Sequence, residues 1–168
     1  IIVSNGLDPR PLKETLDAGI PLVQIVREVP RIGSDVLVAD NLRGGSIVAS
    51  HLLELGHKEM GYVGREPAIS PSRSRLEGFR STLEAAGINM HSGYVVSACY
   101  LPEDGYRATV SLLQRHPEIT AIFAYNDITA LGVIRAAFDL GYPVPEKLSV
   151  VGFDNISLAD LSIPRLTT

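Results

Sequence analysis

The chain has 168 residues, of which 45% are hydrophobic and 20% charged, with a formal net charge of −4, one cysteine and no tryptophan. This composition excludes intrinsic disorder, collagen-like sequence and coiled coil for the chain as a whole, and no apolar run approaches the roughly 18 residues of a membrane span. The acidic balance also argues against binding of a phosphate backbone by this stretch itself, because such binding needs a clustered basic face. A single cysteine, Cys99, fits a reducing compartment.

The two ends indicate a piece of a longer protein. The chain begins at Ile1 inside an apolar run without an initiator methionine, and it stops at Thr168 without a closing helix. We therefore expect further segments on both sides of it.

Short β-branched runs alternate along the chain with segments of helical period, which predicts an α/β fold with a parallel sheet. The predicted strands are, in chain order, 1–4, 21–26, 36–39, 60–64, 94–97, 121–124 and 148–152. The predicted helices, in which apolar residues recur on one face, are 44–55, 73–86, 104–115 and 127–140. Three of these helices end in a glycine that can take the left-handed cap conformation, namely Gly56, Gly87 and Gly141.

Polar side chains follow several predicted strands directly, and doubly wound sheets bind ligands outside these carboxyl ends. Asp40 follows one strand, Asn126 and Asp127 follow another, and Asp154 follows the last. Such residues also cap helices. For Asp127, capping and ligand contact explain the residue equally well, whereas ligand contact is favoured for Asn126 and Asp154. Three aromatic residues near strand ends could stack on a ring: Tyr100, Tyr125 and Phe153. Together these groups favour a neutral, polar, ring-like ligand.

Other features have plain structural explanations. Gly44 and Gly45 suit either a phosphate-binding nest or close helix packing, and packing is favoured because no nucleotide-binding motif accompanies them. Arg75 by itself fits a surface salt bridge, and the spacing from Ser74 to Glu77 fits a capping box. The four histidines share no metal-ligand spacing and none lies beside a plausible nucleophile. The residues therefore indicate no catalytic site, no metal site and no cofactor.

The chain carries six motifs in a characteristic order and spacing, which are 40–45 (DNLRGG), 51–57 (HLLELGH), 75–79 (RLEGF), 126–132 (NDITALG), 150–155 (VVGFDN) and 166–168 (LTT). As a set they resemble the effector-binding core of the lactose/galactose repressor (LacI/GalR) family over almost the whole chain. The resemblance implies a periplasmic-binding-protein-like fold of two Rossmann-like, doubly wound lobes around a ligand cleft. Residues 1–56 would be part of the N-terminal lobe and residues 57–168 the C-terminal lobe.

The resemblance also implies which residues contact the effector. Arg75 matches the family's cleft arginine, Asn126 its amide, Asp154 its carboxylate and Tyr100 its stacking aromatic residue. Asp40 lies near the position of the carboxylate of the N-terminal lobe. Asp127, beside the amide, completes the candidate set.

The function that the resemblance implies is effector control of transcription. A sugar, sugar phosphate, nucleoside or purine in the cleft would shift the lobe arrangement and change operator binding by an N-terminal helix-turn-helix outside this chain. A cytoplasmic homodimer that contacts its partner through 157–163, and no membrane, are further expectations. The alternative is a periplasmic solute-binding protein of a transport system, whereas a Rossmann-class enzyme would need a glycine fingerprint that the sequence lacks. The identity of the effector, and whether it induces or co-represses, stay open.

Overall fold

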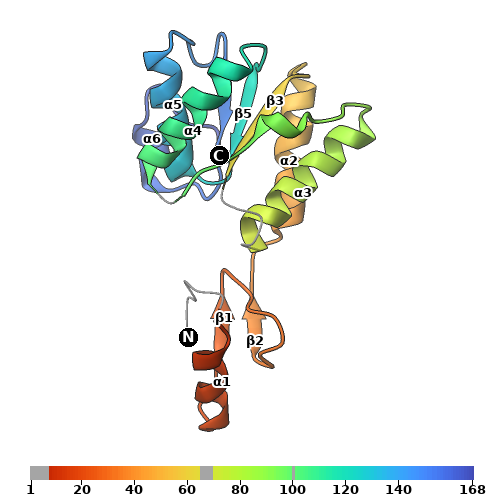
Figure 1. The fold of residues 1–168 in the computed structure, drawn as a ribbon, viewed down its shortest axis with the longest axis vertical. Helices are drawn as coiled ribbons and strands as arrows, with labels where there is room; N and C mark the ends of the chain where they lie inside the picture. Colours follow the sequence, from red (N-terminus) through yellow and green to blue (C-terminus); the bar gives the residue numbers. More distant parts are fainter. Residues whose placement is uncertain (1–7, 65–69, 100) are drawn as a thin grey trace.

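The computed structural model describes residues 8–64, 70–99 and 101–168. Its elements, in chain order, are α1 (Arg10–Asp17), β1 (Val23–Ile25), β2 (Asp35–Leu37), α2 (Asn41–Glu54), β3 (Met60–Gly64), α3 (Ser70–Ala85), the 3₁₀ turn η1 (Ser92–Tyr94), β4 (Val95–Ser97), α4 (Pro102–Arg115), β5 (Ala121–Ala124), α5 (Asp127–Asp139), β6 (Ser149–Val151) and α6 (Ser157–Leu161) (Figure 1). Within these described ranges, no helix is both long enough and apolar enough to cross a bilayer.

The main sheet holds four parallel strands in the order β4-β3-β5-β6. Strand β3 pairs with β4 on one side and with β5 on the other, so the winding of the chain reverses between β3 and β5. Helices α2 and α3 cover one face of this sheet, and α4 and α5 cover the other (Figure 1). The sheet is therefore doubly wound, which confirms the predicted fold class. The crevice outside the carboxyl ends of β3 and β5 is where sheets of this kind bind ligands.

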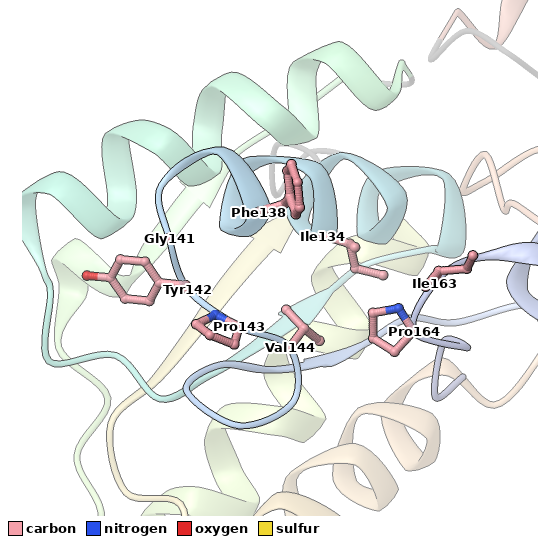
Figure 2. Close-up of a pocket in the computed structure, with 8 residues that line it drawn as sticks. All are labelled: Ile134, Phe138, Gly141, Tyr142, Pro143, Val144, Ile163 and Pro164. Atoms are coloured by element: carbon pink, nitrogen blue, oxygen red, sulfur yellow. The ribbon is translucent and has the colours of Figure 1, made fainter.

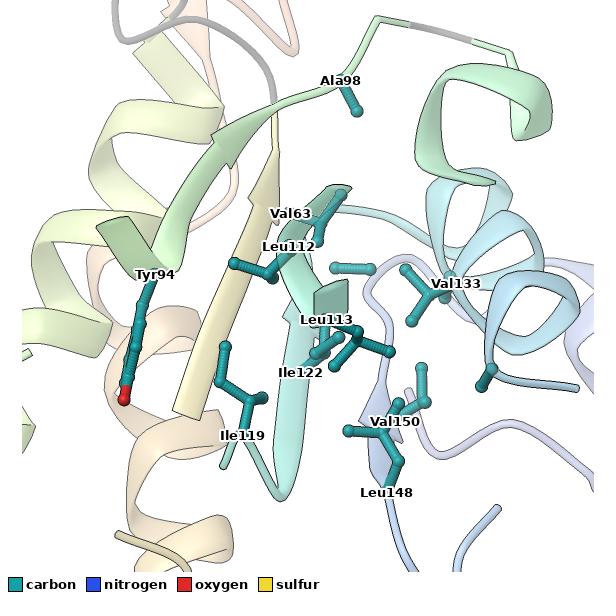
Figure 3. Close-up of a cluster of buried hydrophobic side chains, with 13 residues drawn as sticks. Val63, Tyr94, Ala98, Leu112, Leu113, Ile119, Ile122, Val133, Leu148 and Val150 are labelled. Atoms are coloured by element: carbon teal, nitrogen blue, oxygen red, sulfur yellow. The ribbon is translucent and has the colours of Figure 1, made fainter. Parts of the chain in front are cut away.

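Two hydrophobic clusters fill the space between the sheet and its helices. The cluster under α4 and α5 includes the buried side chains of Leu112 and Val133 (Figure 3). The cluster under α2 and α3 is built around Phe123, whose ring centroid lies 5.4 Å from that of Tyr62 and 5.3 Å from that of Phe79. Strands covered on both faces explain why the sequence shows continuous apolar runs rather than alternation.

Glycines let the main chains of α2 and α3 approach each other. A Cβ atom on Gly45 would lie 1.9 Å from the carbonyl oxygen of Arg75, and one on Gly78 would lie 1.9 Å from the carbonyl oxygen of Leu42. No side chain fits at either position, so the two helices pack at a separation that only glycine permits. This packing agrees with the structural interpretation for Gly45, whereas a Cβ atom on Gly44 would meet the ring of Phe153.

A smaller unit precedes α2 and has its own two-stranded parallel sheet of β1 and β2. Its buried core consists of Leu12, Leu22, Val29 and Ile32. In Figure 1, α1, β1 and β2 lie apart from the main sheet and join it through the segment before α2.

The packing of α2 differs from the division expected from the sequence, which placed residues 1–56 in one lobe. Helix α2 packs on the main sheet, where its buried Leu52 belongs to the same cluster as Phe79 of α3. Its helical period predicted a buried face but not the surface that covers it. We propose instead that the boundary between the lobes lies in the segment 38–40, directly before α2.

Other differences from the sequence prediction concern short elements and helix ends. Helices α1 and α6, of eight and five residues, were not predicted; the apolar pattern of α1 is a single pair, Leu12 and Leu16. The strand predicted over 1–4 lies outside the described residues. Helix α3 begins at Ser70, so Ser74 lies inside the helix and does not cap it. The predicted helix stops are confirmed by positive φ angles of 86°, 79° and 71° at Gly56, Gly87 and Gly141.

Candidate ligand-binding site

The side chain of Arg75 joins the elements that meet at the carboxyl edge of the main sheet. Its Nε donates a hydrogen bond to Oδ1 of Asn41 at 2.8 Å, and its Nη1 donates to the carbonyl oxygen of Tyr125. Its Nη2 donates to Oδ1 of Asp154 at 3.3 Å. Arg75 is only 7% exposed, and hydrogen bonds in such a desolvated setting are stronger than in water. One side chain thus connects the start of α2, the end of β5 and the loop after β6.

The ring of Phe153 contacts the same guanidinium group, with Cζ of Arg75 3.5 Å from the ring centroid. This is the geometry of a cation–π interaction. Burial lowers the pKa of Arg75, and the charge of Asp154 partly offsets that shift; the group stays protonated, as arginine does in proteins. Burial raises the pKa of Asp154, and the charge of Arg75 opposes the rise. The Asp154 side chain is 42% exposed, so the pair can be reached from solvent on that side.

The loop after β6 holds its polar residues in a rare backbone conformation. The φ angle is 106° at Asp154 and 51° at Asn155. Residues other than glycine seldom adopt positive φ, so the surrounding structure must impose this conformation. Strain of this kind concentrates at ligand sites, and here it accompanies the residue whose carboxylate pairs with Arg75.

Asp127, a candidate ligand contact in the sequence analysis, is fully buried. Its Oδ2 accepts a hydrogen bond from the backbone N–H of Ile156 at 2.9 Å, and its Oδ1 accepts one from the hydroxyl group of Thr168. A Cβ atom on Gly152 would lie 2.2 Å from Oδ1, so the glycine leaves room for the carboxylate. These two hydrogen bonds give the carboxylate a structural role, and ligand contact by Asp127 stays a prediction. Sequence reasoning missed this role because both partners are distant in the chain.

Asn126 caps α5, because its Oδ1 accepts a hydrogen bond from the backbone N–H of Thr129 at 2.9 Å. Its Nδ2 has no hydrogen-bond partner among the residues that the structure describes. Asn126 directly follows Tyr125, whose carbonyl group binds Arg75, so it lies at the same edge of the sheet. The structure therefore brings Arg75, Asn126 and Asp154 to one edge, which the strand-end rule indicated for Asn126 and Asp154 and the family resemblance for Arg75.

Asp40 caps α2, accepting a hydrogen bond from the backbone N–H of Arg43 at 3.0 Å. It lines a hollow of about 440 Å³ together with Glu28, Val38, Ala39, Asn41, Leu42 and Ser74. Its neighbour Asn41, which follows the same predicted strand but was not among the candidate contacts, is the residue that reaches Arg75. Tyr100, the predicted stacking residue, lies outside the described residues.

Comparisons with known proteins agree with this architecture. Residues 49–168 match the family model of the periplasmic binding protein-like domain. The chain is 35% identical to the HTH-type transcriptional regulator DegA of Bacillus subtilis, over all of this chain and 51% of that protein. It is 36% identical to the HTH-type transcriptional repressor PurR of Haemophilus influenzae, over 89% of this chain and 44% of that protein. The chain spans about half the length of the curated relatives it matches, and these relatives are named as regulators, not enzymes.

Solved structures show the same arrangement of elements. A sugar-binding LacI-family transcriptional regulator from Escherichia coli, complexed with phosphate, superimposes with a TM-score of 0.86 at 26% identity, over 98% of this chain and 60% of that one. The transcriptional regulator CelR in complex with cellobiose gives a TM-score of 0.84 at 30% identity, over 93% of this chain and 49% of that one. The similarity thus covers both the main sheet and most of the smaller unit before it.

Proposed function

The chain belongs to the family of periplasmic binding protein-like domains, in the form found in LacI-family transcriptional regulators, and on that premise we propose that it binds a small effector controlling operator occupancy. The observation that carries the proposal is the Arg75–Asp154 pair at the carboxyl edge of the main sheet. An effector that binds one lobe arrangement more tightly shifts the population toward it. Couplings of about 1–3 kcal/mol, or about 5–150-fold, suffice to change operator binding by the helix-turn-helix of the whole, cytoplasmic protein.

The donors and acceptors at this edge favour a neutral effector. Arginine has five N–H donors, and three of them in Arg75 make the hydrogen bonds given above. The other two have no partner among the residues that the structure describes. The charge of Arg75 is already balanced by Asp154, and a phosphate group would meet that carboxylate at close range. Neighbouring hydroxyl groups can instead accept from Arg75 and Asn126 and donate to Asp154. We therefore favour a neutral sugar, a nucleoside or a purine over a sugar phosphate.

Homodimerisation is the second part of the proposal. The segment 157–163 exposes large apolar side chains, including Leu161 and Ile163, the latter 92% exposed. Ile163 also borders an apolar hollow of about 410 Å³ whose other lining residues are Ile134, Phe138, Gly141, Tyr142, Pro143, Val144 and Pro164 (Figure 2). A second copy would cover this surface. In sedimentation velocity at micromolar concentration, full-length Leu161→Asp should shift toward monomer relative to wild type. An unchanged dimer would show that the interface lies on another surface.

A ligand screen on the full-length protein tests the effector-binding proposal. A panel of cellobiose, D-glucose, D-ribose, adenosine, hypoxanthine and inorganic phosphate covers the candidate classes. A compound at 100 times its Kd should add about 2.7 kcal/mol of stability, visible as a rise in Tm. Arg75→Ala and Asp154→Ala should abolish that rise, whereas Arg43→Ala, which removes an exposed arginine of α2, should keep it.

Unchanged affinity in both cleft variants would refute the site. A compound that binds wild type but leaves operator affinity unchanged would instead favour the transport-type alternative.

A further inference from the structure

We propose that Asn41 is a positioning residue, which orients Arg75 toward the effector and ties it to the crossover segment 38–40 between the lobes. The proposal deepens the proposed function and rests on it. It concerns the regulation of the same cleft and adds no second site. The contacts of one buried amide group carry it.

The amide group of Asn41 is used at both ends. Its Oδ1 accepts the hydrogen bond from Nε of Arg75 at 2.8 Å, and its Nδ2 donates a hydrogen bond to the carbonyl oxygen of Ala39 at 2.9 Å. The backbone N–H of Asn41 donates to the same carbonyl oxygen at 2.8 Å. Asn41 is 8% exposed, so the loss of either bond would leave a buried polar atom without a partner. These constraints fix both the rotamer and the orientation of the amide.

The bond to Nε determines how Arg75 presents its outer nitrogen atoms. A free arginine side chain carries about 2 kcal/mol of rotamer entropy, which an effector would otherwise have to offset on binding. The bond from Asn41 restrains the inner end of the planar guanidinium group, and the ring of Phe153 restrains one face. The two Nη atoms are therefore preorganised, which improves affinity without any contact between Asn41 and the effector.

The bond to Ala39 links the orientation of Arg75 to the segment between the lobes. Ala39 lies between the end of β2 and the start of α2, in the segment that joins the smaller unit to the main sheet. A change in the angle between the lobes must bend this segment, and with it the two hydrogen bonds that Asn41 makes to Ala39. An effector that immobilises Arg75 thereby stabilises one crossover geometry, and by linkage that geometry favours the effector to the same degree.

Two substitutions separate the two ends of the amide. Asn41→Asp keeps an oxygen acceptor for Nε of Arg75 but sets a carboxylate oxygen against the carbonyl oxygen of Ala39. Asn41→Leu removes both bonds at similar volume. Asn89→Asp, at an exposed position after α3, is the control for the added negative charge.

The first readout needs no effector. In ¹H–¹⁵N correlation spectra of the full-length protein labelled at arginine, the Nε–H of Arg75 should be protected from solvent exchange in wild type. Protection should persist in Asn41→Asp and fall at least ten-fold in Asn41→Leu. Equal protection in all three proteins would overturn the positioning role, and thermal unfolding verifies that each variant is folded.

The second readout uses the panel compound that most stabilises wild type, titrated in the presence and absence of operator DNA. Asn41→Leu should lower affinity for that compound about ten-fold, the effect of losing one charge-assisted hydrogen bond. Asn41→Asp should keep affinity within about three-fold of the Asn89→Asp control, yet lose most of the compound's effect on operator affinity.

Two failures are distinguishable in this design. If Arg75→Ala loses the compound and both Asn41 variants behave as wild type, the Asn41 proposal is wrong and the proposed function stands. If Arg75→Ala still binds the compound, the effector site itself is wrong.

Discussion

Phe153 supports the guanidinium group of Arg75 from one face, with 3.5 Å between Cζ and the ring centroid. The next residue in the chain, Asp154, pairs with the same group through its carboxylate. One loop after β6 therefore supplies both an aromatic face and a hydrogen-bond acceptor to the central cation of the site. A change in this loop should alter recognition without disturbing the sheet beneath it.

The Phe153 contact leads to a prediction for effector affinity. A cation–π interaction contributes about 0.5–2 kcal/mol, so Phe153→Leu should weaken effector binding about 2–30-fold in the full-length protein. Isothermal titration calorimetry with the panel compound measures this loss. Phe138→Leu, which alters an exposed aromatic residue of α5 away from Arg75, should bind as wild type does. Equal affinities for the two variants would show that the stacked ring contributes nothing to recognition.

The contact between α2 and α3 should be intolerant of any side chain at Gly45. A Cβ there would lie 1.9 Å from the carbonyl oxygen of Arg75, so Gly45→Ala must push the helices apart. Overpacking of this kind costs about 1–3 kcal/mol of unfolding free energy, measured by chemical denaturation. Ser50→Ala, at an exposed position of the same helix, is the control and should change stability little. A Gly45→Ala midpoint equal to that of Ser50→Ala would contradict the packing argument.

The buried carboxylate of Asp127 should stabilise the fold rather than contact the effector. Asp127→Ala removes both acceptors, and leaving the N–H of Ile156 unsatisfied costs about 1–3 kcal/mol. Thr168→Val removes one partner and should cost less. In a double-mutant cycle the two effects should be less than additive, because both variants break the same bond. Additive effects, or a loss of effector affinity without a loss of stability, would favour the original ligand-contact hypothesis.

His57 should make stability depend on pH. Its ring nitrogens lie 2.9 Å from Oγ1 of Thr120 and 3.0 Å from Oγ of Ser149, and burial, followed by the charge of His51, lowers its pKa below the usual 6.5. The unfolded chain then binds the proton more readily than the folded one, so His57 weakens stability as the pH falls below about 6.5.

The pH effect is measured as the difference between unfolding free energies at pH 7.5 and pH 5.5. His57→Gln should reduce this difference relative to wild type. The control Ser50→Ala changes an exposed residue of α2 that does not titrate, and it should leave the difference unaltered. A pH dependence that stays the same in His57→Gln would assign the effect to other groups.

Much of the main sheet could be predicted because its signals are local. Strands β3 and β5 are continuous apolar runs, and the helices around them end in glycines whose positive φ the structure confirms. The strand-end rule and the family resemblance together also placed Arg75, Asn126 and Asp154 at one edge. These features depend on short stretches of sequence and on the general geometry of parallel sheets.

The remaining features depend on contacts between distant parts of the chain. The role of Asn41 follows from a hydrogen bond to a residue 34 positions away, which no periodicity or spacing indicates. The structural role of Asp127 depends on partners 29 and 41 positions away. The packing partner of α2 was open for the same reason, since an amphipathic pattern predicts a buried face without specifying what buries it.

The backbone contact through Gly45 and Gly78 has a consequence for protein engineering. We expect helices α2 and α3 to move as one rigid unit, because no side chain separates their main chains at Gly45 and Gly78. Asn41 begins α2 and Arg75 lies in α3, so a change in the angle of the segment 38–40 should displace the guanidinium group of Arg75. An effector site redesigned for a new ligand should stay coupled to the segment 38–40, provided that Gly45 and Gly78 are kept.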